Sequence, residues 1–365
     1  MATLNLGGNH GELPLHFMPQ KIPIAIIGAT GYTGIELARI LVNHPRVEIV
    51  ALTSRQNTGT SYSSLFPAFA GRLDKPCIPL QISPLSRKIK AAFLCLPHHE
   101  SMNVAKAFRS RGVRVIDLSA DFRLKNFSLY EEWYGKHSQK KLLQDAVYGL
   151  PELYRQKIKE AKLVASPGCY PTSILLGLTP LLQKKMISTE GIICDSKSGV
   201  SGAGRASQMD ILFGEVNDSL KAYKVGTHRH TAEIEQELSL QAGEPLKVLF
   251  SPHLVPMDRG ILSTIYATPL RKWSTADLVA LYQKFYRKEK FVTVLPEGIL
   301  PVTKNVRGTN QCHVAILYDK RTDRIVIISA IDNLTKGASG QAVQSFNLMF
   351  GLDETLGLKS IGMIP

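Results

Sequence analysis

Short apolar runs alternate with helical repeats along the first part of the chain. Four runs rich in apolar and β-branched residues are bounded by Gly, Pro, Asp or Ser, at residues 22–29, 47–54, 91–97 and 113–119. Two segments with helical spacing, residues 33–45 and 99–112, separate the first and second runs and the third and fourth. Strands that are apolar on both faces are usually covered by helices on both sides. The alternation therefore predicts a doubly wound, Rossmann-type α/β domain over residues 21–168.

The second part of the chain has longer strands and fewer helices. A helix is predicted at residues 171–185, and strands are predicted at residues 191–199, 246–256, 260–270, 312–319 and 324–333. The last two strands form a predicted hairpin around "KRTD". This pattern indicates an α+β domain with a mainly antiparallel sheet over residues 169–335. A final helix within residues 336–365, with apolar residues three and four apart, is expected to pack back on the first domain.

Composition excludes several classes of protein. With 44% hydrophobic and 20% charged residues and no apolar run near the roughly 20 residues of a membrane helix, we expect no membrane partner. The first twenty residues lack the features of a secretory signal, and we interpret residues 1–20 as a disordered extension or a segment added by cloning. The five cysteines are scattered without a CxxC pair, which favours a cytoplasmic protein without disulfides or a metal site.

The net charge of +14 indicates anionic partners. Basic residues do not form a dense run with interleaved aromatic side chains, so small anionic molecules are favoured over nucleic acid.

A glycine-rich loop joins the first predicted strand to the first predicted helix. In "IIGATGYTGIEL" the glycines are Gly28, Gly31 and Gly34, and the loop also carries Thr30, Tyr32 and Thr33. Glycines at such a turn let backbone N–H groups approach a phosphate at a helix N-terminus. The alternative is that a turn between a strand and a helix contains glycine only because of its backbone geometry. The next strand ends with Ser54 and Arg55 where NAD sites usually carry an acid. A hydroxyl and a cation suit a 2′-phosphate, so the loop predicts NADP(H), unless Arg55 is simply a solvated loop residue.

A cysteine stands at the start of the helix predicted in the second part. Cys169 follows Pro167-Gly168, and a helix N-terminus would lower the pKa of its thiol and favour the nucleophilic thiolate. The alternative is a buried packing residue, the interpretation we favour for Cys95 and Cys194.

An acid/base partner for the cysteine is available in "THRHTAEIEQ". If this stretch is extended, His228 and His230 share one side and Arg229 faces away. The structural alternative is a pair of satisfied histidines, and zinc binding has too few further ligands. Two anion-binding candidates remain. Arg123 follows a strand of the first domain, and the loop of residues 197–205, with Gly199, Gly202 and Gly204, is flexible enough to wrap a phosphate or to be an ordinary surface loop.

Eight motifs in order resemble those of the N-acetyl-γ-glutamyl-phosphate reductases of arginine biosynthesis. They are "GATGYTG", "DLSADFR", "YGLPEL", "SPGCYPT", "KSGVSGAGR", "HRHTAEIEQ", "HLVPMDRGI" and "DNLTKGASGQA", and they run from residue 22 to the C-terminus. The resemblance implies NADPH-dependent reduction of an acyl phosphate to a semialdehyde with release of phosphate. The family carries Pro where this chain has Ala232, which affects the helix start and no catalytic group.

Individual roles follow from the same resemblance. Cys169 would be the nucleophile and His228 the acid/base, with support from His230 and Glu233. Ser198, Gly199, Gly202 and Asn333 would contact the cofactor, Asn333 at the nicotinamide amide. Arg123 resembles the phosphate-binding arginine of the related aspartate-semialdehyde dehydrogenases and would contact the substrate there. Apart from the resemblance, we name Arg259 as a further candidate for contact with the substrate. A homodimer or homotetramer is expected. Two other hypotheses stay open: a sister acyl-phosphate reductase of the lysine or aspartate pathway, and an NADP-binding protein without catalysis.

Overall fold

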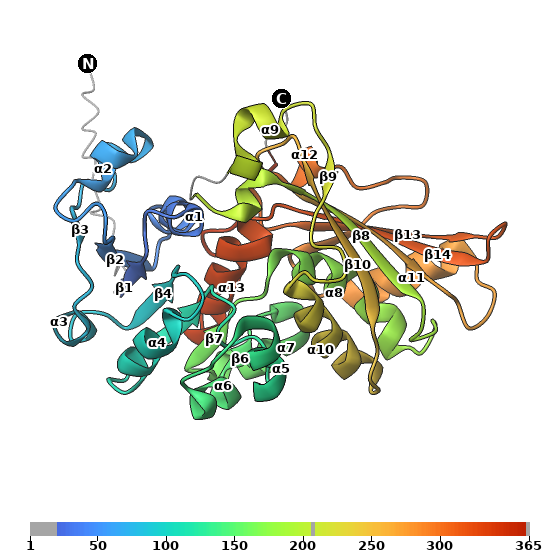
Figure 1. Ribbon diagram of the computed structural model, residues 1–365, viewed down its shortest axis with the longest axis horizontal. Helices are drawn as coiled ribbons and strands as arrows, with labels where there is room; N and C mark the ends of the chain where they lie inside the picture. Colours follow the sequence, from blue (N-terminus) through green and yellow to red (C-terminus); the bar gives the residue numbers. More distant parts are fainter. Residues whose placement is uncertain (1–19, 206–208, 363–365) are drawn as a thin grey trace, which may run out of the picture.

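The computed structural model describes residues 20–205 and 209–362 of the chain. The predicted extension, residues 1–20, lies outside the described residues apart from Gln20. Within the described residues the chain forms two seven-stranded sheets, which occupy opposite halves of the molecule (Figure 1).

The first sheet is parallel throughout. Its strands, in spatial order, are β3 (Cys77–Ile78), β2 (Val47–Thr53), β1 (Ile22–Ile27), β4 (Ala91–Leu94), β5 (Arg114–Asp117), β7 (Leu163–Ala165) and β6 (Val147–Tyr148). Every pairing between them is parallel. Because chain order reverses beside β1, the carboxyl ends of β1 and β4 flank the crevice where doubly wound sheets bind ligands. The predicted Rossmann-type domain is confirmed.

Alternate residues of β1 enter two different cores, as the period of a strand requires. Ile24 and Ile26 pack with α1 (Tyr32–Leu41) on one face. Ala25 and Ile27 pack on the other face, with α4 (Ser101–Arg109) and α5 (Phe127–Tyr134). Both faces of the sheet are therefore buried, which explains why its strands are apolar without alternation.

The second sheet is mixed and mainly antiparallel, as predicted. Its strands, in spatial order, are β12 (Val292–Val294), β13 (Cys312–Asp319), β14 (Arg324–Ile331), β11 (Ile261–Ala267), β8 (Ile192–Gly199), β10 (Val248–Val255) and β9 (Lys221–Ala222). Only the β12–β13 and β8–β10 pairings among these strands are parallel. The hairpin of β13 and β14 is confirmed.

Helices cover one face of the second sheet. The longest, α8 (Cys169–Gln183), is buried from Tyr170 to Leu182 and packs on β11 and β14. Beside it lie α10 (His230–Ala242) and α11 (Thr275–Tyr286). The remaining helices are α7 (Pro151–Glu160) and the short α2 (Tyr62–Leu65), α3 (Ile82–Ser86), α6 (Lys140–Asp145), α9 (Phe213–Val216) and α12 (Thr303–Val306).

The chain returns to the first domain after β14. A π-helical turn (Thr335–Ser339) leads into α13 (Gly340–Met349), in which every residue is buried. Val343 and Phe346 belong to the same core as Ile24 and Ile26 of β1. In Figure 1 α13 lies between the first sheet and α8. The predicted return of the last helix is confirmed.

Candidate active site

Two of the three loop glycines are required by close backbone approach. Gly28 has φ +82°, and a Cβ there would lie 2.4 Å from the carbonyl oxygen of Cys95. A Cβ on Gly34 would lie 2.6 Å from the carbonyl oxygen of Gly28. Gly31 is different, because the nearest atom to its Cβ position is 3.8 Å away. The open side of Gly31 leaves room for a ligand against the start of α1.

A cavity of about 350 Å³, the first cavity, opens at this loop and is lined by Gly31, Tyr32 and Thr33. Gly31 caps α1 without a side-chain hydrogen bond, so the first N–H groups of the helix can donate hydrogen bonds to an anionic ligand. Arg205 crosses from the second domain and donates to the carbonyl oxygen of Thr30 (2.9 Å). A helix N-terminus with a nearby cation fits the pyrophosphate of a dinucleotide.

Ser54 and Arg55 stand at the end of β2, outside the lining of the first cavity. The Ser54 hydroxyl lies 3.1 Å from that of Thr30. The Arg55 side chain is 82% exposed and pairs with Glu100 (2.8 Å). A 2′-phosphate would therefore compete with Glu100 for the Arg55 guanidinium.

Cys169 is the first residue of α8, directly after the N-cap Gly168. Burial raises the pKa of the Cys169 thiol to about 11, although backbone N–H groups of Tyr170 and Cys169 and the charge of Arg123 act to lower it. The prediction of a lowered thiol pKa is therefore wrong for the unliganded protein. Desolvation by the surrounding second domain outweighs the helix terminus, so the thiol needs a base.

Glu233 and Arg123 hold the backbone beside the cysteine. Glu233 accepts hydrogen bonds from the N–H of Gly168 and the hydroxyl of Tyr148, both at 2.8 Å. Its other oxygen lies 3.3 Å from the Arg123 guanidinium in a buried ion pair. Arg123 also donates to the carbonyl oxygens of Ser166 (2.7 Å) and of another loop residue. Arg123 lines the first cavity, but internal acceptors occupy its guanidinium.

The two histidines lie together near Cys169. A Cβ on Gly168 would lie 2.6 Å from Nε2 of His230, and the ring centroids of His228 and His230 are 4.8 Å apart. Nδ1 of His228 accepts the backbone N–H of His230 (3.1 Å). Burial lowers the pKa of His228 to about 4, and the pKa of His230 also lies well below its ordinary value because of burial.

Arg229 does not face away as the extended-strand argument predicts. Its φ of −56° and ψ of −27° are helical, so His228, Arg229 and His230 turn around a helix start. All three line a second cavity of about 490 Å³. The cavity wall also includes residues that the sequence analysis did not single out, namely His98, Tyr134, Tyr170, Lys221, Tyr223 and Lys224. The two lysines of "KAYK", just before the histidines, were the sequence signal that could have identified this part of the cavity wall.

The two cavities meet at Cys169. Four residues line both of them: His98, Cys169, Gly202 and His230. A ligand in the first cavity and another in the second would touch there, beside the thiol.

The glycine loop of residues 197–205 is fastened rather than free. The N–H groups of Gly199, Val200 and Ser201 donate to carbonyl oxygens of the segment 257–260. A Cβ on Gly199 would lie 2.8 Å from the backbone nitrogen of Arg259, so a glycine at this position lets the two backbone segments approach each other closely. Ser198 lines the second cavity.

Asn333 lines the first cavity and joins two segments around it. Its side chain accepts from the N–H of Gly260 (2.7 Å) and donates to Ser201 (2.9 Å). These two contacts hold the loop of residues 197–205 against the end of β14.

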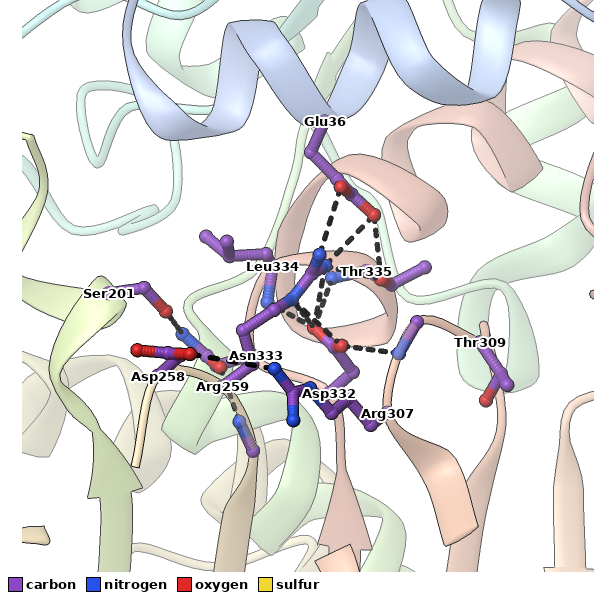
Figure 2. A network of polar contacts seen from close by, with 12 residues as sticks. Glu36, Ser201, Asp258, Arg259, Arg307, Thr309, Asp332, Asn333, Leu334 and Thr335 are labelled. Carbon is purple, nitrogen blue, oxygen red and sulfur yellow. Dashed lines mark hydrogen bonds and ion pairs between the residues drawn. The ribbon is translucent and has the colours of Figure 1, made fainter. Parts of the chain in front are cut away.

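Arg259 lies outside both cavities. Figure 2 shows its guanidinium between Glu36 of α1 and Asp332, which follows β14. It lies 2.9 Å from Glu36 and 3.0 Å from Asp332, and it donates to Thr335 (3.0 Å). The structure thus places Arg259 in a polar link between the two domains, and its predicted contact with substrate has no support from this position.

Within the described residues, no three His, Cys, Asp or Glu side chains are grouped so that they could hold a metal ion. No helix of those residues is long and apolar enough to cross a membrane.

A parallel-sheet domain with a dinucleotide cradle, joined to a mixed-sheet domain that presents a cysteine at the shared crevice, defines the semialdehyde dehydrogenase class. The family model "Semialdehyde dehydrogenase, NAD binding domain" matches residues 23–161. The model "Semialdehyde dehydrogenase, dimerisation domain" matches residues 169–333.

Within this class the chain belongs to the N-acetyl-γ-glutamyl-phosphate reductase family. It is 54% identical to the N-acetyl-γ-glutamyl-phosphate reductase of Citrifermentans bemidjiense over 345 residues, 94% of this chain and 100% of the relative. It is 53% identical to that of Geobacter sulfurreducens and 52% identical to that of Moorella thermoacetica, with the same coverage.

Solved structures share the fold at low identity. Aspartate semialdehyde dehydrogenase II from Vibrio cholerae has a TM-score of 0.70 at 18% identity and covers 91% of this chain and 99% of its own. The enzyme from Candida albicans, solved with NADP, has a TM-score of 0.63 at 16% identity, with the same coverage.

Proposed function

We infer that the chain is an NADPH-dependent reductase that converts N-acetyl-γ-glutamyl phosphate to N-acetylglutamate 5-semialdehyde and phosphate, a step of arginine biosynthesis. The observation that carries this conclusion is the meeting of the two cavities at Cys169. One cavity starts at the dinucleotide loop. The other is lined by the cations Lys221, Lys224 and Arg229 and by one acidic residue, Asp210, and this excess of positive charge suits a phosphorylated, carboxylated substrate. The family membership supplies the particular substrate.

The first cavity fits the cofactor. The N-terminus of α1 with Gly31, Tyr32 and Thr33 would hold the pyrophosphate, and Asn333 and Gly202 lie farther along the same wall. Ser54 and Arg55 are proposed to contact the 2′-phosphate. When bound, NADPH supplies the hydride that reduces the acyl group.

Cys169 is proposed to carry the acyl group. Its Sγ forms a bond to the carbonyl carbon, the carbon–oxygen bond to phosphate breaks, and the thiol proton passes to the leaving phosphate through a histidine. After reduction the resulting thiohemiacetal collapses, the carbon–sulfur bond breaks, and the thiol regains a proton as the aldehyde leaves. The thiol pKa of about 11 makes this proton acceptor necessary.

We propose His230 as the group that exchanges the proton, with His228 as its support. His230 lines both cavities and packs on Gly168, whereas His228 lines only the second. This assignment exchanges the roles that the family resemblance implied. Both rings are neutral near pH 7 because burial lowers their pKa, so His230 has an unprotonated ring nitrogen, although the same shift makes it a weaker base than an exposed histidine. Glu233 is proposed to position Gly168 rather than to transfer protons.

The outer face of the second sheet is proposed as the contact between subunits of a homodimer or homotetramer. Ile193, Leu249 and Tyr266 are 38%, 52% and 37% exposed on its neighbouring strands. The matching family model is described as a dimerisation domain. We also propose a cytoplasmic location, since all five cysteines are free.

The decisive experiment is phosphate-dependent reduction of NADP⁺ with N-acetylglutamate semialdehyde. Wild-type protein should be active, and Cys169→Ala should be inactive while still binding NADP⁺. Activity with aspartate semialdehyde instead would change the substrate, and full activity of Cys169→Ala would refute the covalent role.

A further inference from the structure

The reacting carbon must sit where the two cavities meet, because it has to reach both the Cys169 sulfur and the hydride donor. Four residues form that junction. Cys169 and His230 already have proposed roles, and Gly202 has no side chain. His98 is the remaining side chain at the junction.

The backbone orients the ring of His98. Its Nδ1 accepts the N–H of Ala120 (3.2 Å), in the loop that follows β5. A ring nitrogen that accepts a hydrogen bond carries no proton, so the neutral ring carries its proton on Nε2. Burial, reinforced by the charges of Arg123 and Arg229 and opposed by Asp121, lowers the pKa of His98 to about 4. His98 thus offers a neutral N–H donor at the junction near pH 7.

Arg229 and His98 both contact the ring of Tyr134. The guanidinium carbon of Arg229 is 5.4 Å from the centroid of Tyr134, and the His98 ring packs edge-on against Tyr134 at 5.5 Å. Within residues 20–205 and 209–362, no acidic side chain forms an ion pair with Arg229, whereas Arg123 is paired with Glu233. Arg229 is therefore a cation available to a ligand.

We propose that His98 and Arg229 bind the phosphate group of the acyl phosphate, and the inorganic phosphate that leaves it, with His98 donating a hydrogen bond and Arg229 supplying positive charge. This inference rests on the proposed function. The phosphate is attached directly to the reacting carbon, so it has to lie at the junction. The α-carboxylate is separated from that carbon by two methylene groups and the α-carbon, so we assign it to Lys221 and Lys224 of the second cavity. Arg229 lines the same cavity, and we assign it to the phosphate because it contacts the same Tyr134 ring as His98.

The test is steady-state kinetics in the direction that consumes inorganic phosphate. His98→Ala and Arg229→Met should each raise the KM for phosphate by about ten-fold or more, with the KM for NADP⁺ and for the aldehyde nearly unchanged. His98→Gln, which keeps an N–H donor, should recover part of the loss. His99→Asn is the matched control, since His99 has φ +71° and Asn tolerates this backbone, and it lines neither cavity.

A binding measurement separates this inference from the proposed function. Inorganic phosphate should slow alkylation of Cys169 by iodoacetamide in wild-type protein, and His98→Ala should need about ten-fold more phosphate for the same protection. Wild-type protein without phosphate-dependent activity would refute the proposed function. An active wild type whose His98→Ala variant keeps its KM for phosphate, or instead raises the KM for the aldehyde, would overturn only the phosphate site.

Discussion

Glu36 provides the sharpest test of how the two domains are joined. Its side chain lies on α1, is 5% exposed, and forms ion pairs with Arg39 of the same helix and Arg259 of the second domain. Burial acts to raise the pKa of Glu36, but the hydrogen bonds and charges of these two arginines outweigh it and lower the pKa to about 2. The perturbation is Glu36→Gln, which removes the charge and keeps the shape. Arg259 retains Asp332 in this variant, so it does not become an isolated buried charge.

The magnitude follows from proton linkage. A fall of the pKa from 4.5 in the unfolded chain to about 2 in the folded protein corresponds to about 3 kcal/mol of stability at pH 7. The folded state binds this proton more weakly than the unfolded state, so the stabilisation is complete above pH 4.5 and is lost as the pH falls through 2. About 1 kcal/mol is lost by pH 4 and about 2 kcal/mol by pH 3.

Urea unfolding of wild type and Glu36→Gln at pH 7, 5, 4 and 3 measures this directly. The difference in free energy of unfolding should be about 3 kcal/mol at pH 7 and about 1 kcal/mol at pH 3. Glu48→Gln, an exposed carboxylate on β2, should show almost no difference at any pH. A difference for Glu36→Gln that stays constant with pH, or that is absent at pH 7, would refute the reasoning.

Four further outcomes are expected. Gly34→Ala should lower both thermal stability and NADPH affinity because its Cβ would lie 2.6 Å from a backbone oxygen. Gly31→Ala should leave stability nearly unchanged, so a loss of NADPH affinity measured by titration of this variant would report contact between the added methyl group and the bound phosphate. Glu233→Gln should lower the free energy of unfolding by about 3 kcal/mol, since it leaves a buried guanidinium unpaired. Arg55→Ala should weaken NADPH binding by about ten-fold and leave NADH binding unchanged, and equal losses would contradict a 2′-phosphate contact. Alkylation of Cys169 in unliganded protein should accelerate about ten-fold per pH unit from pH 7 to 10, and a plateau near pH 7 would contradict the raised thiol pKa.

The fold was predictable because its signals are local. The apolar run before Gly28 and the helical spacing after it define β1 and α1 without help from distant residues. The same holds for α8 and for the hairpin of β13 and β14. The parallel pairing of β8 with β10 was not predictable, because it depends on which strands meet across more than forty intervening residues.

The site was predictable in its residue types and less so in its geometry. Cys169, His228 and His230 stand out by sequence, but the thiol pKa depends on burial by the rest of the second domain. Arg229 enters the cavity because its backbone is helical, a detail that alternation in an extended chain gets wrong. His98 carries no motif, and only the folding of two domains around it brings it beside the thiol.

The burial of α13 has a consequence for how the protein is made. Val343 and Phe346 fill the same core as Ile24 of β1, so the first domain contains side chains that are translated more than 300 residues after its first strand. Until those residues leave the ribosome, the nascent first domain has an apolar face without its partner. The reductase therefore completes its first core only after the whole second sheet has been translated, and chaperones have a long interval in which to bind it.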